Sequence, residues 1–254
     1  MAESGFDIGF GLEGSHVLVT GSSGAIGSVV VKAFLAAGAY VSAFDLVEPR
    51  QPIQNERLNF YQVDITDESR VEQAMESART VFGSLVDMPL RAWQKVLNVN
   101  VDGTFLTCRA WLRGIRSHAT PAAKNISAIL FGSEAGTFGV PLCAPYAASK
   151  SAIQHGLVKS LARDAVNINP RCRINAVAPG PVATAQFQKE CDDDPKALWR
   201  EAQATVALHQ PVPIEAVARA CLFLASDNFS GNITGQVLPV DSGKSGALLW
   251  PEAP

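Results

Sequence analysis

Short apolar runs alternate along the chain with segments in which apolar residues recur every three or four positions. The runs are rich in Val, Ile, Leu and Phe, which is typical of strands buried on both faces of a parallel sheet. They predict strands at His16–Thr20, Tyr40–Phe44, Asn59–Val63, Ile126–Phe131, Arg173–Val177 and Gln236–Val240. The periodic segments predict helices at Ile26–Ala37, Glu68–Thr80, Arg91–Ser117 (with a break), Tyr146–Val166 and Glu215–Leu224.

This alternation predicts βαβ units and therefore an α/β fold, a doubly wound and mostly parallel sheet with helices on both faces. No repeat or linker marks a boundary, so residues 1–254 are expected to form a single domain. Residues 183–210 interrupt the alternation because they are polar and contain the acidic cluster Asp192–Asp194. An insertion of this kind is often a lid over a substrate site, and a solvated surface excursion is the equal alternative.

Composition and charge exclude several classes of protein. The chain has 254 residues, 47% of them hydrophobic, and a net charge of −3 without a basic stripe, so nucleic acid is not an expected partner. Its longest apolar runs fall far short of the ~20 residues that span a bilayer, and its first residues do not resemble a secretory signal. Five scattered cysteines without a C-x-x-C pair predict free thiols, no metal site and a reducing, cytoplasmic location.

A glycine-rich turn follows the first predicted strand. The residues TGSSGAIG lead directly into a helix, where glycines allow backbone to approach a pyrophosphate and the helix N-terminus favours the anion. Asp45 ends the second strand eighteen residues after Gly27, where a carboxylate accepts hydrogen bonds from the ribose of NAD and repels the phosphate of NADP. The pattern predicts a Rossmann-type site for NAD(H), while the nearby Arg50 keeps NADP(H) possible.

Asp64 lies at the end of the third predicted strand, in the sequence VDIT. Its carboxylate could accept a hydrogen bond from an adenine amino group. It could equally cap the helix that follows, as Thr66 or Asp67 could. Both interpretations stay open.

The most specific pattern is Tyr146-Ala-Ala-Ser-Lys150 on a predicted helix, with Ser133 thirteen residues earlier. The spacing of four residues places Tyr146 and Lys150 on one helical face. A neighbouring ammonium is expected to lower the pKa of the phenol, which is near 10 in water, so that it can act as an acid or base. Ser133 is placed to hydrogen-bond a substrate oxygen on which charge develops.

Taken together, these motifs resemble the classical branch of the short-chain dehydrogenase/reductase family. The resemblance covers Leu12 to Gly243 through TGSSGAIG, AFDL, VDIT, NVNVDGTF, GSEAG, YAASK, INAVAPGPVAT, FLASD and ITGQVLPVDSG. It implies an oxidoreductase that transfers a hydride between NAD(P) and a ketone or secondary alcohol. By this resemblance Tyr146 is the acid/base, Lys150 its activator, Ser133 the carbonyl orienter and Asn100 the water-binding member of a catalytic tetrad.

The resemblance also implies which residues contact the cofactor and the substrate. The cofactor set is Thr20, Gly21, Ser23, Gly24, Ile26, Gly27, Asp45, Asp64, Ile65, Tyr146, Lys150, Pro179, Gly180, Val182 and Thr184. The expected substrate is a medium-sized, largely apolar small molecule near Glu134, Val140, Leu142 and Cys143. A homodimer or homotetramer is expected, with Gly103–Ser117 and Tyr146–Val166 packed across two-fold interfaces.

Two departures from the family are minor: Ala25 and Gly24 fit the glycine spacing of extended family members, and Ser242 replaces a glycine. The serious departure lies between Asp64 and Asn100, where roughly fifteen residues that normally form a central strand and an Asn-Asn-Ala-Gly turn are absent. We expect Val81–Val86 to supply that strand beside His16–Thr20, the alternatives being a sheet closed by Ile126–Phe131 or a chain that lacks a coded segment. The functional alternative is a catalytically silent nucleotide-binding or scaffold protein.

Overall fold

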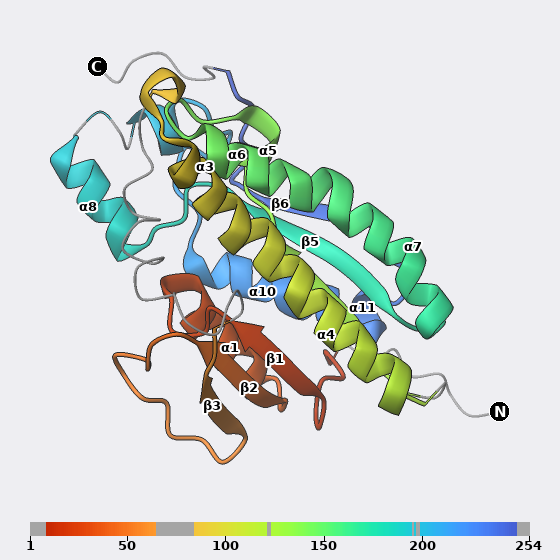
Figure 1. The fold of residues 1–254 in the computed structure, drawn as a ribbon. Coiled ribbons are helices and arrows are strands. Elements are labelled where there is room, and N and C mark those ends of the chain that lie inside the picture. The colour runs from red at the N-terminus through yellow and green to blue at the C-terminus, as the bar shows by residue number, and fades with distance from the viewer. Residues whose placement is uncertain (1–8, 65–83, 121–122, 195, 197–198, 248–254) are drawn as a thin grey trace.

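The computed structural model describes residues 9–64, 84–120, 123–194, 196 and 199–247 (Figure 1). The strands are β1 (His16–Thr20), β2 (Tyr40–Asp45), β3 (Leu58–Gln62), β4 (Ser127–Phe131), β5 (Arg173–Pro179) and β6 (Val237–Val240). The α-helices are α1 (Ala25–Ala36), α3 (Leu90–Leu97), α4 (Gly103–His118), α5 (Ala135–Phe138), α6 (Ala144–Ser151), α7 (Val158–Ile168), α8 (Ala185–Asp193), α10 (Ile214–Ala225) and α11 (Asp227–Ser230). The predicted strands are confirmed to within two residues at each end, and the predicted helix Glu68–Thr80 lies outside the described residues.

Two predicted long helices contain π-helical segments. Asn98–Asp102 joins α3 to α4, and Ala152–Leu157 joins α6 to α7. The break expected in Arg91–Ser117 is therefore a local widening of the helix. Such segments are frequent at functional sites because they re-aim side chains.

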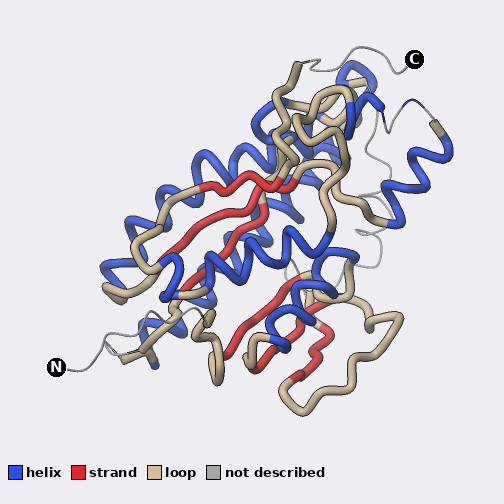
Figure 2. The backbone as a smooth tube through the Cα atoms, turned by 180° about the vertical axis from the view of Figure 1, so that it is seen from behind, coloured by secondary structure: helices blue, strands red, loops and turns tan. Residues whose placement is uncertain are grey.

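The fold class is confirmed as α/β with parallel strands, but the strands form two sheets of three. Their orders are β1-β2-β3 and β4-β5-β6, with His16 opposite Tyr40 and Ser127 opposite Arg173. Figure 2 shows the two groups of strands from behind. Within the described residues no hydrogen-bonded ladder joins β1 to β4, so the alternative in which Ile126–Phe131 closes the sheet is wrong.

The prediction of a strand at Val81–Val86 is wrong for residues 84–86, the part that the structure describes. Residues 81–83 lie outside the described residues, while Ser84 precedes a 3-10 turn at Leu85–Asp87. The Ser84 hydroxyl accepts a hydrogen bond from the Val86 amide, and such local bonds compete with strand pairing. The Val86 side chain is 91% exposed, so it does not fill the sheet.

Helices cover both faces of the β4-β5-β6 sheet, and α1 covers one face of β1 and β2 (Figure 1). Helix α1 packs on β1 and β2 and against α10, which itself contacts β4, β5 and β6. Helix α7 covers β5 on the other face and contacts α4. The helical spacing of Val30, Val31, Phe34 and Leu35 explains why α1 buries this side.

Two findings bear on membranes and metals. No helix in the described part of the chain is long and apolar enough to cross a membrane. Among those same residues, no cluster of His, Cys, Asp or Glu could hold a metal ion. All five cysteines are buried free thiols, as the sequence predicts.

Candidate active site

The glycine-rich turn is built for close backbone packing. Gly21 follows β1 with a φ of +66°, a left-handed conformation that favours glycine. A Cβ at Gly27 would collide with the Gly21 carbonyl, so the first turn of α1 can approach β1 only with glycine there. Gly24 caps α1, and among the described residues no side chain caps that N-terminus, which leaves its N–H groups directed outward.

Asp45 lies beside this turn, at the end of β2. The residue is 8% exposed, and its carboxylate accepts hydrogen bonds from the Ser23 amide at 2.8 Å and the Leu46 amide at 2.7 Å. These bonds fix the acid at the rim of the turn. The buried Ser22 hydroxyl has no hydrogen-bond partner within the described structure, a feature that the glycine pattern did not single out.

Two predicted cofactor contacts, Asp64 and Ile65, follow β3. Asp64 is half-buried, just beyond β3, while Ile65 lies outside the described residues. The Gln62 side chain donates a hydrogen bond to the Leu46 carbonyl at 2.7 Å and so ties the end of β3 to the loop after β2.

Ser133, Tyr146 and Lys150 meet at one cavity of about 320 Å³. Ser133 follows β4, and the other two side chains come from α6. The Lys150 ammonium lies 5.6 Å from the centre of the Tyr146 ring. Five more residues of the predicted cofactor set line the same cavity: Ile26, Pro179, Gly180, Val182 and Thr184.

The Lys150 side chain is directed into the protein. Its ammonium donates a hydrogen bond to the Phe131 carbonyl at 3.0 Å. Burial lowers the pKa of Lys150 to about 8, because the charged form loses hydration.

The expected lowering of the Tyr146 pKa is wrong for this structure. Burial raises the pKa of the phenol, the hydrogen bond with Ser133 opposes that rise, and the charges of Cys143 and Glu134 add to it. Lys150 does not reverse the balance because its ammonium is turned to the Phe131 carbonyl. Tyr146 is consequently a protonated phenol at neutral pH.

Asn100 supports the catalytic helix through a relay. Its amide donates a hydrogen bond to the Ser149 hydroxyl at 2.8 Å, and that hydroxyl donates to the Tyr146 carbonyl at 2.7 Å. Asn100 lies in the π-helical segment before α4, at a second cavity that it shares with Thr20, Gly21 and Lys150.

Sequence reasoning missed Gln154. This side chain is fully buried, accepts a hydrogen bond from the Ser133 amide at 2.9 Å and donates one to the Thr137 hydroxyl at 2.8 Å. A Cβ at Gly132 would collide with its amide oxygen. Only its place four residues after Lys150, on the same helical face, could have indicated this supporting role.

The outer wall of the cavity comes from α8, through Gln186, Phe187 and Glu190. The four predicted substrate contacts are not on its wall: Cys143 is buried at the start of α6, and Leu142 is 60% exposed. Glu134 instead pairs with Lys244 at 3.5 Å.

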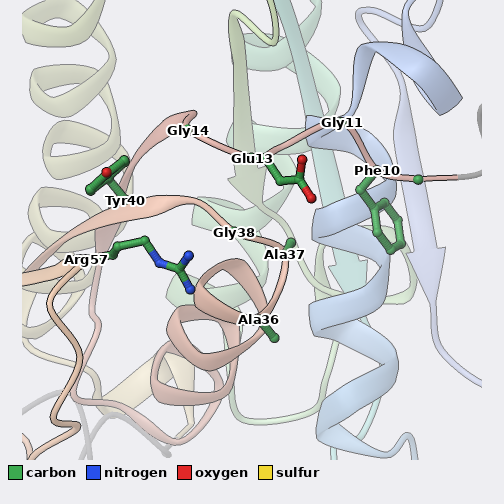
Figure 3. A pocket seen from close by; sticks show the side chains of 10 residues that line it. Phe10, Gly11, Glu13, Gly14, Ala36, Ala37, Gly38, Tyr40 and Arg57 are labelled. Atoms are coloured by element: carbon green, nitrogen blue, oxygen red, sulfur yellow. The ribbon is translucent and has the colours of Figure 1, made fainter.

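A larger cavity, about 690 Å³, lies at the amino ends of β1 and β2 (Figure 3), and neither Ser133 nor Tyr146 is among the described residues that line it. Arg57 extends from its wall toward the last turn of α1, and its guanidinium donates a hydrogen bond to the Leu35 carbonyl at 3.1 Å. That bond satisfies a carbonyl group at the end of α1, which gives Arg57 a structural role.

Comparison with known proteins identifies families and relatives that resemble this chain. Residues 78–245 match the family described as Enoyl-(Acyl carrier protein) reductase, and residues 18–113 match the 3-beta hydroxysteroid dehydrogenase/isomerase family. The chain is 30% identical over 260 residues to short-chain dehydrogenase reductase 3a of Arabidopsis thaliana, covering 93% of this chain and 97% of that protein. It is also 30% identical over 259 residues to 2-(S)-hydroxypropyl-CoM dehydrogenase 3 of Xanthobacter autotrophicus, covering 91% and 97%.

Among solved structures, one from Beutenbergia cavernae has a TM-score of 0.77 at 26% identity, covering 92% of this chain and 98% of that one. It is described as a candidate NAD(P)-dependent gluconate 5-dehydrogenase with NADP bound at low occupancy.

Proposed function

The chain belongs to the short-chain dehydrogenase/reductase family and is an oxidoreductase that uses a nicotinamide cofactor, and we propose that it interconverts a ketone and a secondary alcohol. The observation that carries this proposal is the gathering of Ser133, Tyr146 and Lys150 at one cavity. When bound, the cofactor supplies or accepts the hydride. The chain's own residues provide the binding surface and the proton.

The glycine-rich turn Gly21–Gly27, which we call the cradle, fits such a cofactor. The outward N–H groups of α1 suit a pyrophosphate, and the Ser22 hydroxyl, buried without a partner among the described residues, is available to bind an added oxygen. Pro179, Gly180, Val182 and Thr184 line the cavity together with Ile26 of α1 and would hold the nicotinamide side.

Tyr146 is the proposed proton donor. A phenol is protonated at neutral pH and so carries the proton that a carbonyl oxygen takes up during reduction. Burial raises the pKa of Tyr146 and so opposes this transfer, whereas the hydrogen bond with Ser133 lowers the pKa and favours it. The Ser133 hydroxyl, held by Gln154 through the serine amide, would hydrogen-bond the same oxygen. Lys150 lies one helical turn behind the phenol and would hold ribose hydroxyls.

We propose a preference for NAD(H). The Asp45 carboxylate is fixed at the rim of the cradle by backbone amides, so a phosphate on the ribose would meet a like charge. In a partly buried site this costs about 1–3 kcal/mol, or ~10–100-fold in affinity. Replacing Asp45 with Ser is expected to bring the NADH and NADPH affinities together.

The substrate is proposed to be a medium-sized, largely apolar ketone or alcohol, with residues 183–210 acting as a lid. The position of Phe187 on the outer wall of the cavity supports an apolar substrate, and Gln186 and Glu190 give the same wall a polar part. We also propose a homodimer or homotetramer through α4 and α7, where Phe105 and Val166 are exposed.

A panel of ketones and secondary alcohols tests the proposed reaction, with each cofactor present and the absorbance of the reduced nicotinamide as the readout. Oxidation or formation of NADH by wild type, but not by Tyr146→Phe, is the expected result. Equal rates in both proteins would refute the role of the phenol.

A further inference from the structure

A buried ion pair lies directly beside the catalytic serine. Glu134 follows Ser133 in the chain, and its carboxylate lies 3.5 Å from the Lys244 ammonium. The side chain of Glu134 is 11% exposed and that of Lys244 is 8% exposed. Lysine and glutamate are rarely buried to this extent unless they are paired. A buried ion pair often adds no net stability, so stability alone does not explain its place beside Ser133.

The backbone of Glu134 is held by its neighbours on both sides. Its amide donates a hydrogen bond to the Pro179 carbonyl at 2.9 Å. Its carbonyl accepts hydrogen bonds from the amides of Thr137 and Phe138, both at 2.9 Å, in the first turn of α5. The main chain at Glu134 is therefore fixed, and the position of the carboxylate depends on the partners of the side chain.

The segment after β6 brings Lys244 to this loop. Residues 242–245 are joined to residues 205–208, the end of the proposed lid, by backbone hydrogen bonds of 3.0–3.1 Å. Lys244 lies opposite Val206 in an antiparallel bridge, and Val206 is fully buried. The ammonium that pairs with Glu134 is therefore presented by a segment that is itself fixed to the end of the lid.

Titratable groups surround Tyr146 on several elements. Those on its own helix, on the loop after β4 and on the elements that pack against α6 or line its cavity are Arg91, Lys95, Asp102, Glu134, Cys143, Lys150 and Glu190. Burial raises the pKa of the phenol, the hydrogen bond with Ser133 lowers it, and the charges of Cys143 and Glu134 raise it further. A cation that pairs with a carboxylate weakens the effect of that carboxylate on a nearby phenol.

We propose that Lys244 is a positioning residue for the reaction, whose ammonium holds the Glu134 carboxylate and balances its charge so that Tyr146 can release and take up its proton. Reduction leaves a phenolate when the proton passes to the carbonyl oxygen, and oxidation begins from a phenolate that accepts the proton of the alcohol. An unbalanced carboxylate nearby opposes the phenolate in both directions.

This inference rests on the proposed role of Tyr146 as the acid of ketone reduction. Neither Glu134 nor Lys244 is among the described residues that line the cavity at Tyr146. Lys244 therefore acts on the phenol through Glu134 and not through the substrate. The charge of the phenol can be followed without turnover, so the inference and the proposed function can fail separately.

The ionisation of Tyr146 in the free protein is the direct test. The chain has three tyrosines, Tyr40, Tyr61 and Tyr146. Replacing all of them with 3-fluorotyrosine gives a fluorine resonance for each ring, and the resonance that is missing from Tyr146→Phe belongs to Tyr146. The pH dependence of its chemical shift gives the pKa of this phenol. Ring fluorination also lowers the pKa of a phenol, which brings the titration to a milder pH.

The key variant is Lys244→Gln, which keeps a hydrogen-bond donor for the carboxylate but removes the charge. It should raise the pKa of Tyr146 by about half a pH unit or more, and Lys244→Arg should restore the wild-type value. Glu134→Gln should lower this pKa. Adding Lys244→Gln to Glu134→Gln should then change nothing, because Lys244 acts only through the carboxylate. Lys159→Gln, an exposed lysine of α7, is the matched control and should titrate like wild type.

A merely structural role for Lys244 would lower the melting temperature of Lys244→Gln and leave the pKa of Tyr146 in place, which would overturn the proposal. A difference in this pKa between Glu134→Gln and the double variant would also overturn it, and this comparison decides the matter if Lys244→Gln alone does not fold. Absence of turnover with every ketone would refute the proposed reaction, while the fluorine titration would still decide the role of Lys244.

Discussion

Lys150 makes the folded protein less stable at neutral pH. Its ammonium is buried beside the Phe131 carbonyl, and its pKa falls from 10.5 to about 8. Between these values the unfolded chain binds more protons than the folded chain, so the free energy of unfolding rises with pH. At 1.36 kcal/mol for each pH unit, this interval corresponds to about 3 kcal/mol. The penalty is complete below pH 8 and disappears above pH 10.5.

Replacing Lys150 with Met removes this penalty and also the hydrogen bond to Phe131, which costs about 1–3 kcal/mol at every pH. We therefore expect the free energy of unfolding of Lys150→Met minus that of wild type to be about 3 kcal/mol larger at pH 7 than at pH 10.5, so that the variant gains relative stability at the lower pH. Urea unfolding at both pH values measures the difference. Lys159→Met, at an exposed position of α7, is the control and should show a much smaller change with pH.

A difference between variant and wild type that is the same at both pH values would refute this reasoning. It would mean that the ammonium is hydrated in the folded protein and that its contact with Phe131 is formed without a desolvation cost.

Three further outcomes are expected. Tyr146→Phe should lower turnover by ~10²-fold or more with an unchanged circular dichroism spectrum, and full activity in a folded variant would count against the phenol as the acid. Gly27→Ala should weaken NADH binding in a fluorescence titration because its methyl group collides with the Gly21 carbonyl, whereas unchanged affinity would contradict that packing. Asp227→Ala should destabilise the protein by about 3–5 kcal/mol in urea unfolding, because it leaves the buried Arg173 charge without its partner at 3.0 Å; a loss below about 1 kcal/mol would contradict this.

The strands and the catalytic helix were predictable because their signals are local. The run His16–Thr20 matches β1 at both ends, and the spacing of Tyr146 and Lys150 places both side chains at one cavity. A short apolar or periodic pattern fixes such elements without knowledge of the rest of the chain.

What the sequence did not reveal depends on tertiary surroundings. The pKa of Tyr146 is raised because the phenol is desolvated and because the Lys150 ammonium is directed to the Phe131 carbonyl. The spacing of four residues between Tyr146 and Lys150 predicts neither of these features. Gln154 supports Ser133 only because the chain brings α6 and its π-helical extension against the loop after β4. Apolar character made Val86 a candidate strand residue, but the Ser84 turn holds it at the surface.

The central claim is that the cradle at Gly21–Gly27 and the cavity at Tyr146 form one nicotinamide-cofactor site. The most direct test is a titration of the wild-type protein with NADH and with NADPH, followed by the fluorescence of the reduced nicotinamide. The account predicts saturable binding of NADH, ~10–100-fold tighter than that of NADPH. Absence of a saturable signal with either cofactor, the behaviour of a silent scaffold, would contradict it.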